Sequence, residues 1–153
     1  MERIRVAEVM TRDPITIKPE TSLLDCAKIM VKKRVGTLLL VNGKKLIGLI
    51  SRKDILWALI KKSKQDLSKI KAVDISPKKI ATVKPDSTIR EALNKMKHVK
   101  FERLPVIFGG NLVGMLTARD ILSVHPEAYP ELEEFTHIRE ESEKLRRIKK
   151  IKD

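Results

Sequence analysis

Hydrophobic positions along this chain follow two local patterns, one typical of helices and the other of buried strands. Apolar residues recur with helical spacing at Leu23, Cys26 and Met30, and lysines occupy positions between them. Segments 38–41 and 46–50 are instead apolar at nearly every position and flank an Asn-Gly turn. The first pattern predicts an amphipathic helix with one buried face. The second predicts a hairpin of two short strands in a sheet that is covered on both faces.

The whole pattern occurs twice, at a constant separation of 66 residues and without a gap. Thr16 matches Thr82, and the polar signature at 51–54 matches that at 117–120. Further matches are Met30 with Met96, Leu38 with Leu104, Gly43 with Gly109, Gly48 with Gly114, and Ile55 with Ile121. Because the period is longer than that of solenoid repeats, each copy is predicted to be a small subdomain. Units of about 60 residues are marginal alone, so the copies are expected to share an interface.

Prolines and capping residues mark the beginning of each copy. Leading strands are expected at 15–17 and 81–83, and each is stopped by a proline, which cannot donate to a sheet ladder. Ser22 and Thr88 are each followed three residues later by an acid, which is the capping-box pattern. The first helix of each copy is therefore expected to begin there.

A second helix-start signal follows each hairpin and carries the candidate chemistry. Ser51 and Thr117 stand at the capping position, and Asp54 and Asp120 fall in the first helical turn. The second helices are expected over 53–61 and 119–124.

These elements predict an α+β fold of two pseudo-symmetric repeats of short sheets packed with helices. The expected segments are repeat one at 4–60, a basic linker at 61–71, repeat two at 72–125 and a charged helical extension at 126–153. The extension carries apolar residues at the spacing of one or two amphipathic helices, at Leu132, Phe135, Ile138, Leu145, Ile148 and Ile151. It either folds back over its own domain or contacts another chain.

Composition indicates a folded protein, with 42% hydrophobic and 35% charged residues. No apolar run is long enough to cross a bilayer, and the N-terminus lacks the apolar core of a signal peptide, so we expect a cytoplasmic location and no membrane partner. Cys26 is the single cysteine, which excludes an intrachain disulfide, and its match Ala92 indicates core packing. The three histidines lack ligand spacing, so no metal site is predicted.

The net charge of +13 raises the alternative of nucleic-acid binding. Residues 126–153 hold 7 basic and 8 acidic side chains, which leaves 26 against 12 in residues 1–125. The excess is spread over the repeats, with a local concentration at 61–64 that continues through Lys69 and Lys71. Only five aromatic residues occur, too few for the stacking platforms that bind single strands. A solvated Lys-rich surface, also typical of heat-adapted proteins, is the favoured interpretation.

The residues of both copies match a known family. The run Arg103-Leu104-Pro105-Val106, the run from Gly114 through Thr117 to Asp120, and the opening run from Val6 to Pro14 resemble the tandem CBS domain, or Bateman module, of stand-alone archaeal and bacterial proteins. The resemblance spans about residues 4–125. In the first copy Leu39 replaces the usual proline and Thr37 stands in place of Arg103, so the second copy is the closer match.

The resemblance implies a sensor in which the paired repeats form a cleft for an adenosyl ligand: AMP, ADP, ATP or S-adenosylmethionine. The residue chemistry is compatible with this. A carboxylate such as Asp54 or Asp120 accepts two hydrogen bonds from a ribose diol. Ser51 or Thr117 at a helix N-terminus donates to a phosphate oxygen.

The predicted ligand site contains these four residues together with strand and basic residues of both copies. Apolar walls are expected from Ile17, Val83, Val106 and Leu40, additional hydroxyls from Thr16 and Thr82, and phosphate contacts from Arg103, Arg119, Arg52 and Lys53.

Other interpretations stay open beside this one. A hydroxyl residue with an acid three positions on is also an ordinary helix cap, and Thr16 and Thr82 also suit a strand without any ligand. No nucleophile with a base emerges, so no catalytic residue, no enzymatic activity and no required cofactor is predicted. The remaining possibilities are a regulatory homodimer, an accessory subunit without ligand whose extension docks on a protein partner, and the nucleic-acid binder.

Overall fold

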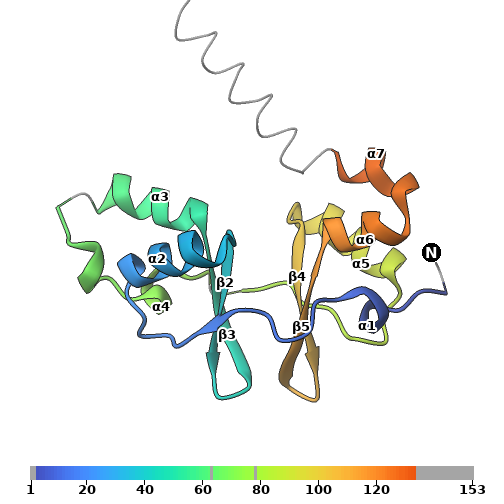
Figure 1. Ribbon diagram of the computed structural model, residues 1–153, viewed down its shortest axis with the longest axis horizontal. Coiled ribbons are helices and arrows are strands. Elements are labelled where there is room, and N and C mark those ends of the chain that lie inside the picture. The colour runs from blue at the N-terminus through green and yellow to red at the C-terminus, as the bar shows by residue number, and fades with distance from the viewer. Residues whose placement is uncertain (1–2, 63, 78, 134–153) are drawn as a thin grey trace, which may run out of the picture. The chain divides into compact units, whose positions relative to one another are not determined.

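The first helix, the hairpin and the second helix of each copy follow the predicted order, and the elements gather into two units, one for each copy of the repeat. A computed structural model describes residues 3–62, 64–77 and 79–133 (Figure 1). The copy-one unit is formed by residues 14–80 and 110–112. The copy-two unit is formed by residues 3–13, 81–109 and 113–133.

The copy-one unit is a three-stranded sheet covered on one face by helices. Its elements are β1 (Thr16–Ile17), α2 (Leu23–Lys33), β2 (Thr37–Asn42), β3 (Lys45–Ser51), α3 (Arg52–Lys61), a 3₁₀ turn (Leu67–Lys69) and α4 (Ala72–Ile75). Strand β2 lies in the middle, parallel to β1 and antiparallel to β3. Figure 1 shows α2 and α3 on the same side of the β2–β3 hairpin.

The copy-two unit repeats this arrangement with a two-stranded sheet. Its elements are α1 (Val6–Val9), α5 (Ile89–Val99), β4 (Arg103–Phe108), β5 (Asn111–Thr117), α6 (Ala118–Val124), a 3₁₀ turn (Pro126–Ala128) and α7 (Tyr129–Leu132). The α+β class, the two hairpins and the first-helix starts at the N-caps Ser22 and Thr88 confirm the predictions. Both second helices begin one residue earlier than expected.

The leading strand predicted in copy two is reduced to a single parallel bridge between Val83 and Val106. In copy one the backbone N–H of Leu39 donates to the carbonyl of Ile15 at 3.2 Å and extends the pairing. Copy two has Pro105 at the position of Leu39, and proline has no N–H to donate. Pro105 therefore explains why copy two has no regular strand at the position that corresponds to β1.

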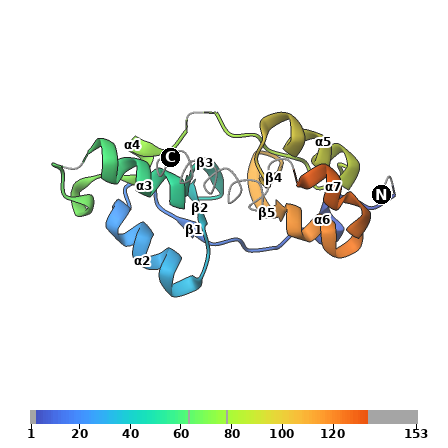
Figure 2. The same ribbon diagram turned by 90° about the horizontal axis from the view of Figure 1, so that it is seen from above.

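Each unit also contains a short segment that lies, along the chain, just before the other copy of the repeat. In the copy-two unit, Val6 N–H donates to Ser87 O at 2.8 Å, and α1 packs near α6, as the dark-blue segment shows in Figure 2. The matching bond in the copy-one unit runs from Ala72 N–H to Thr21 O, also at 2.8 Å. The repeats were predicted at 4–60 and 72–125, and the packed units exchange the leading segment of each predicted repeat.

The two faces of the copy-one sheet differ in character. Ile17, Leu38, Leu40 and Ile50 point to the helices and join one hydrophobic core with residues of α2 and α3. Fully burying a leucine or isoleucine contributes about 1.5–3 kcal/mol, so this face anchors the unit. Side chains alternate along a strand, so the residues between them, beginning with Thr37, lie on the opposite face.

The linker and the extension each contain structure. Asp66 caps the 3₁₀ turn within the predicted 61–71 linker, and Lys71 bridges to Ser22 at the start of α2. In the extension, Leu132 of α7 is fully buried and Glu131 pairs with Arg90 of α5 at 2.8 Å. The predicted helical part from 134 onward lies outside the described residues. No helix among the described residues is long and apolar enough to span a membrane.

Candidate functional site

Ser51 and Asp54 form a reciprocal cap where β3 ends and α3 begins. The backbone N–H of Ser51 donates to Asp54 Oδ2 at 2.7 Å, and the Ser51 hydroxyl donates to the same oxygen at 2.9 Å. In return, Asp54 N–H lies 3.4 Å from Ser51 Oγ. These bonds hold a half-buried carboxylate and a hydroxyl side by side and use Oδ2, so Oδ1 is the oxygen that can bind a ligand.

Thr117 and Asp120 repeat this cap at the start of α6. Thr117 N–H donates to Asp120 Oδ2 at 2.8 Å, and Asp120 N–H donates to Thr117 Oγ1 at 3.1 Å. Both pairs are partly buried. The structure therefore shows the helix-capping role of all four residues directly, and a ligand role would be an additional one.

The register of the copy-one sheet gathers hydroxyl groups on the face opposite the core. Thr37 is directly opposite Ser51, and Thr16 is directly opposite Leu39. Cross-strand partners point to the same face of a sheet, and so do residues two apart on one strand. Thr16, Thr37 and Ser51 therefore share one face with Leu39. We call this the Ser51 face.

Thr37 places a buried hydroxyl without a hydrogen-bond partner on this face. Its side chain is 7% exposed, and among the described residues Thr37 Oγ1 is a buried side-chain oxygen with no hydrogen bond. Leaving such a group unsatisfied costs about 1–3 kcal/mol. A ligand group that hydrogen-bonds Thr37 would remove this cost.

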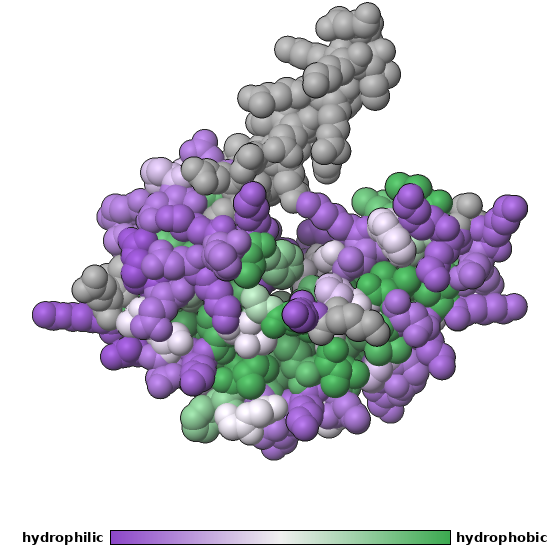
Figure 3. All heavy atoms as spheres, turned by 180° about the vertical axis from the view of Figure 1, so that it is seen from behind, coloured by the Kyte–Doolittle hydropathy of each residue, from purple (hydrophilic) through white to green (hydrophobic). Residues whose placement is uncertain are grey.

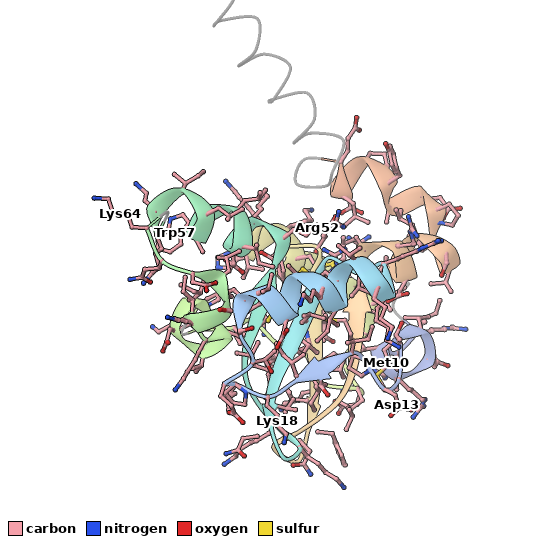
Figure 4. The ribbon with its side chains drawn as sticks, turned by 60° about the vertical axis from the view of Figure 1, so that its left-hand side comes forward. Met10, Asp13, Lys18, Arg52, Trp57 and Lys64 are labelled. Carbon is pink, nitrogen blue, oxygen red and sulfur yellow. The ribbon has the colours of Figure 1, made fainter. Side chains whose placement is uncertain are left out.

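Arg52 lies against Gly36, the residue that precedes Thr37 in the chain. A Cβ on Gly36 would meet the Arg52 Nε at 2.5 Å, so only glycine leaves room for the guanidinium there. Arg52 N–H also donates to Gly36 O at 3.1 Å, which ties the start of α3 to the start of β2. Figure 4 shows Arg52 at the first turn of α3 and Trp57 farther along the same helix.

Copy two carries different charges at the equivalent positions. Glu102 replaces Gly36 and Ala118 replaces Arg52, while the backbone bond is kept, from Ala118 N–H to Glu102 O at 2.8 Å. The Glu102 carboxylate is paired with the Arg103 guanidinium at 3.5 Å. Arg103, which was predicted to contact phosphate, is therefore beside an acid of its own copy.

Several predicted site residues lie in the hydrophobic cores. Ile17, Leu40, Val83 and Val106 are at most 7% exposed and belong to the helix-facing cores of their units. Their burial is explained by core packing, and they do not share the Ser51 face. The apolar side chains that do share it include Leu39 and its cross-strand partner Leu49.

The remaining predicted residues lie nearer the surface. Thr16 is exposed, Thr82 is half-buried and its carbonyl accepts a hydrogen bond from Lys95 Nζ, and Arg119 and Lys53 are exposed on their helices.

Sequence reasoning named Arg52 but missed its contact with Gly36 and the unpaired hydroxyl of Thr37. The alignment of the two copies at 66 residues could have drawn attention to these positions. Gly36 is matched by Glu102 and Arg52 by Ala118, so the charge changes at both positions although the surrounding residues are similar. No local pattern shows that the Thr37 hydroxyl lacks a partner, since that depends on what surrounds it in three dimensions.

Two copies of a helix, a hairpin and a second helix, each with a capped hydroxyl and carboxylate at the start of the second helix, define a duplicated α+β module. The family model of the CBS domain matches residues 6–61 and 72–127, and the chain belongs to this family as a tandem pair. Among curated relatives, inosine-5′-monophosphate dehydrogenase of Korarchaeum cryptofilum (strain OPF8) is 32% identical over 127 residues. The match covers 82% of this chain but spans about a quarter of that enzyme, 25%.

Two solved structures show similar CBS pairs with ligands bound. The CBS domain pair of protein MJ0100, in complex with 5′-methylthioadenosine and S-adenosyl-L-methionine, has 26% identity and a TM-score of 0.71, covering 80% of this chain and 96% of its own. The CBS domain protein PAE2072 from Pyrobaculum aerophilum, complexed with AMP, has 28% identity and a TM-score of 0.71, covering 84% and 98%.

Proposed function

We propose that the chain is a non-enzymatic sensor that binds an adenosyl ligand, either an adenine nucleotide or S-adenosylmethionine, and signals to a partner by a change of shape. The observation that carries this proposal is the duplicated cap, which holds a hydroxyl and a half-buried carboxylate together in both copies. A carboxylate held in this way suits a ribose diol, the part that all these ligands share. The ligands bound in the structures of MJ0100 and PAE2072 support the same class.

Calorimetric titration with AMP, ATP and S-adenosylmethionine tests the proposal. Binding at or below millimolar concentration is expected, and Asp120→Ala is expected to weaken it more than Asp54→Ala, because copy two matches the family more closely. Absence of binding by all three ligands would refute the proposal.

A matched control separates loss of a ligand group from loss of a helix cap. Thr88 caps α5 and accepts from Glu91 N–H at 3.1 Å, as Thr117 does for α6. Thr88→Ala should lower stability by about 1 kcal/mol, as loss of a cap does, and leave ligand affinity unchanged. If Thr88→Ala weakens binding as much as Asp120→Ala, the loss reflects instability and the ligand role of Asp120 is wrong.

We further propose that output passes through α3 in a homodimer. This helix exposes large apolar side chains, among them Ile60 at 74% and Leu56 at 58%. The matching positions in copy two are Pro126 and Leu122, and the latter packs against its own core. Exposed apolar patches of this kind commonly mark interaction sites.

Ile60→Glu is expected to convert a dimer to a monomer in multi-angle light scattering while far-ultraviolet circular dichroism stays unchanged. Lys61→Glu on the same helix is the charge control. An unchanged mass in Ile60→Glu would place the dimer interface elsewhere or exclude it. A docking role for the extension is a separate proposal, tested by whether a protein partner captured by the full chain is lost when residues 126–153 are deleted.

The nucleic-acid alternative has less support. Hydrophilic side chains are spread over much of the surface in Figure 3, and no aromatic platform accompanies them in the sequence. A phosphate-driven complex must weaken steeply with salt. Gel shifts at low salt that show no complex with DNA or RNA would remove this alternative.

A further inference from the structure

The two copies differ most sharply in charge at two positions next to the capped hydroxyl. In copy one these positions are Gly36 and Arg52, and in copy two they are Glu102 and Ala118. The backbone bond that joins each pair is present in both copies, at 3.1 Å and 2.8 Å. The frame is therefore the same, and the change lies in the side chains.

Copy one offers positive charge and an unused hydroxyl. The Arg52 guanidinium lies over the bare Cα of Gly36, and among the described residues Arg52 forms no ion pair. Thr37 Oγ1 is buried without a hydrogen bond and shares a sheet face with Ser51. A guanidinium and a hydroxyl are the donors that bind phosphate oxygens, the guanidinium in a bidentate manner.

Copy two offers less positive charge at these positions. Ala118 brings no charge, and the Glu102 carboxylate lies 3.5 Å from Arg103 and already neutralises it. A phosphate placed here would meet a guanidinium that a carboxylate already pairs with, so the local charge is less favourable for it than in copy one. An uncharged group or a cationic sulfonium does not depend on that guanidinium.

We propose that the copy-one site selects an adenosyl ligand with a 5′-phosphate, whereas the copy-two site selects one with an uncharged or sulfonium group at that position. The inference rests on the proposed adenosyl-binding function. It refines that proposal, since for a phosphate-bearing ligand it reverses the expected ranking of Asp54 and Asp120.

Two probes that share adenosine and differ at the 5′ position test the selection: AMP and 5′-methylthioadenosine. Each is titrated calorimetrically into Asp120→Ala, which keeps the copy-one site, and into Asp54→Ala, which keeps the copy-two site. In Asp120→Ala, AMP is expected to bind about tenfold or more tightly than 5′-methylthioadenosine, the effect of a charge-assisted hydrogen bond. In Asp54→Ala the order should reverse.

Substitutions at the named donors make the test specific. In the Asp120→Ala background, Arg52→Ala should abolish the preference for AMP, while Lys61→Ala, at the far end of α3, should leave it intact. Thr37→Val should weaken the binding of AMP several-fold. It should also raise the melting temperature of the free protein, because it removes a buried unpaired hydroxyl. A residue with only a structural role would not change stability and affinity in opposite directions.

The outcomes separate the two proposals. If neither probe binds the wild-type protein, the adenosyl-binding function fails and the selection fails with it. If both probes bind but their affinity ratio is the same in both single-site variants, the function stands and the charge selection is wrong.

Discussion

At the scale of single residues, Cys26 shows how burial changes the pKa of a side chain. Its side chain is fully buried in α2, and this burial, with a smaller contribution from the Asp25 carboxylate, raises the pKa of the thiol from 9.0 to about 11. The unfolded chain therefore loses the thiol proton at lower pH than the folded chain. The free energy of unfolding should be unaffected by Cys26 below pH 9 and should fall as pH rises from 9 toward 11.

Cys26→Ala isolates this effect from the titration of the many lysines. Copy two has Ala92 at the matching position, fully buried, so the unit tolerates alanine there. Urea denaturation between pH 7.5 and 10.5 should show a steeper loss of stability in wild type than in Cys26→Ala. Parallel pH profiles would show that Cys26 ionises equally in both states.

At the scale of elements, both long helices end in a residue that is unusual for its conformation. Arg34 follows α2 with φ 56° and Lys100 follows α5 with φ 54°, so both adopt the left-handed conformation that favours glycine. Arg34→Gly and Lys100→Gly are each expected to raise stability by about 1 kcal/mol, measured by thermal or urea unfolding. Lys32→Gly, inside α2, is the control and should lower it by about 1 kcal/mol. A loss in all three variants would exclude backbone strain at the caps.

Glycines on the second strand of each hairpin allow a neighbouring segment to approach closely. A Cβ at Gly114 would lie 2.9 Å from the backbone oxygen of Thr11 and 2.7 Å from Met10 Sδ. A Cβ at Gly48 would instead meet the side-chain oxygen of Ser76 at 2.3 Å. Either Gly→Ala change should cost about 1–3 kcal/mol through overpacking.

The difference between these two sites appears in double variants. Ser76→Ala should recover part of the cost of Gly48→Ala, whereas Met10→Ala should recover less of the cost of Gly114→Ala, because a backbone oxygen cannot be trimmed. Chemical denaturation of the four single and two double variants measures both couplings. Equal recovery would mean that the Thr11 backbone moves freely.

Local signals predicted most elements, and the exceptions have specific physical causes. Hairpins and helix starts depend on neighbouring residues, such as the Ser22 hydroxyl and the Asp25 N–H that it caps at 3.1 Å, so the sequence pattern was sufficient. The leading strand of copy two is lost because of Pro105, which lies more than 20 residues away along the chain. A pattern of neighbouring residues cannot reveal so distant a pairing partner. The unpaired hydroxyl of Thr37 and the place of Arg52 over Gly36 depend equally on contacts that only the fold creates.

At the scale of the whole molecule, the exchange of leading segments makes each unit depend on residues that belong to the other repeat. Val6 is fully buried in the core of the copy-two unit, and its N–H donates to Ser87 O at 2.8 Å. In the copy-one unit the same place is taken by Ala72, so residues 3–13 contribute nothing to that core.

Deletion of residues 1–13 should therefore affect the two units unequally. Losing a buried valine and several paired backbone groups should lower hydrogen-exchange protection of α5 and β5 by about 100-fold or more, because each lost contact contributes of order 1 kcal/mol. Amides of α2 and β2 in the same sample serve as the internal control and should keep more of their protection, since segment 70–76 still completes their unit. Equal loss in both units would mean that the repeats unfold as one cooperative body and that the exchanged segment stabilises the pair as a whole.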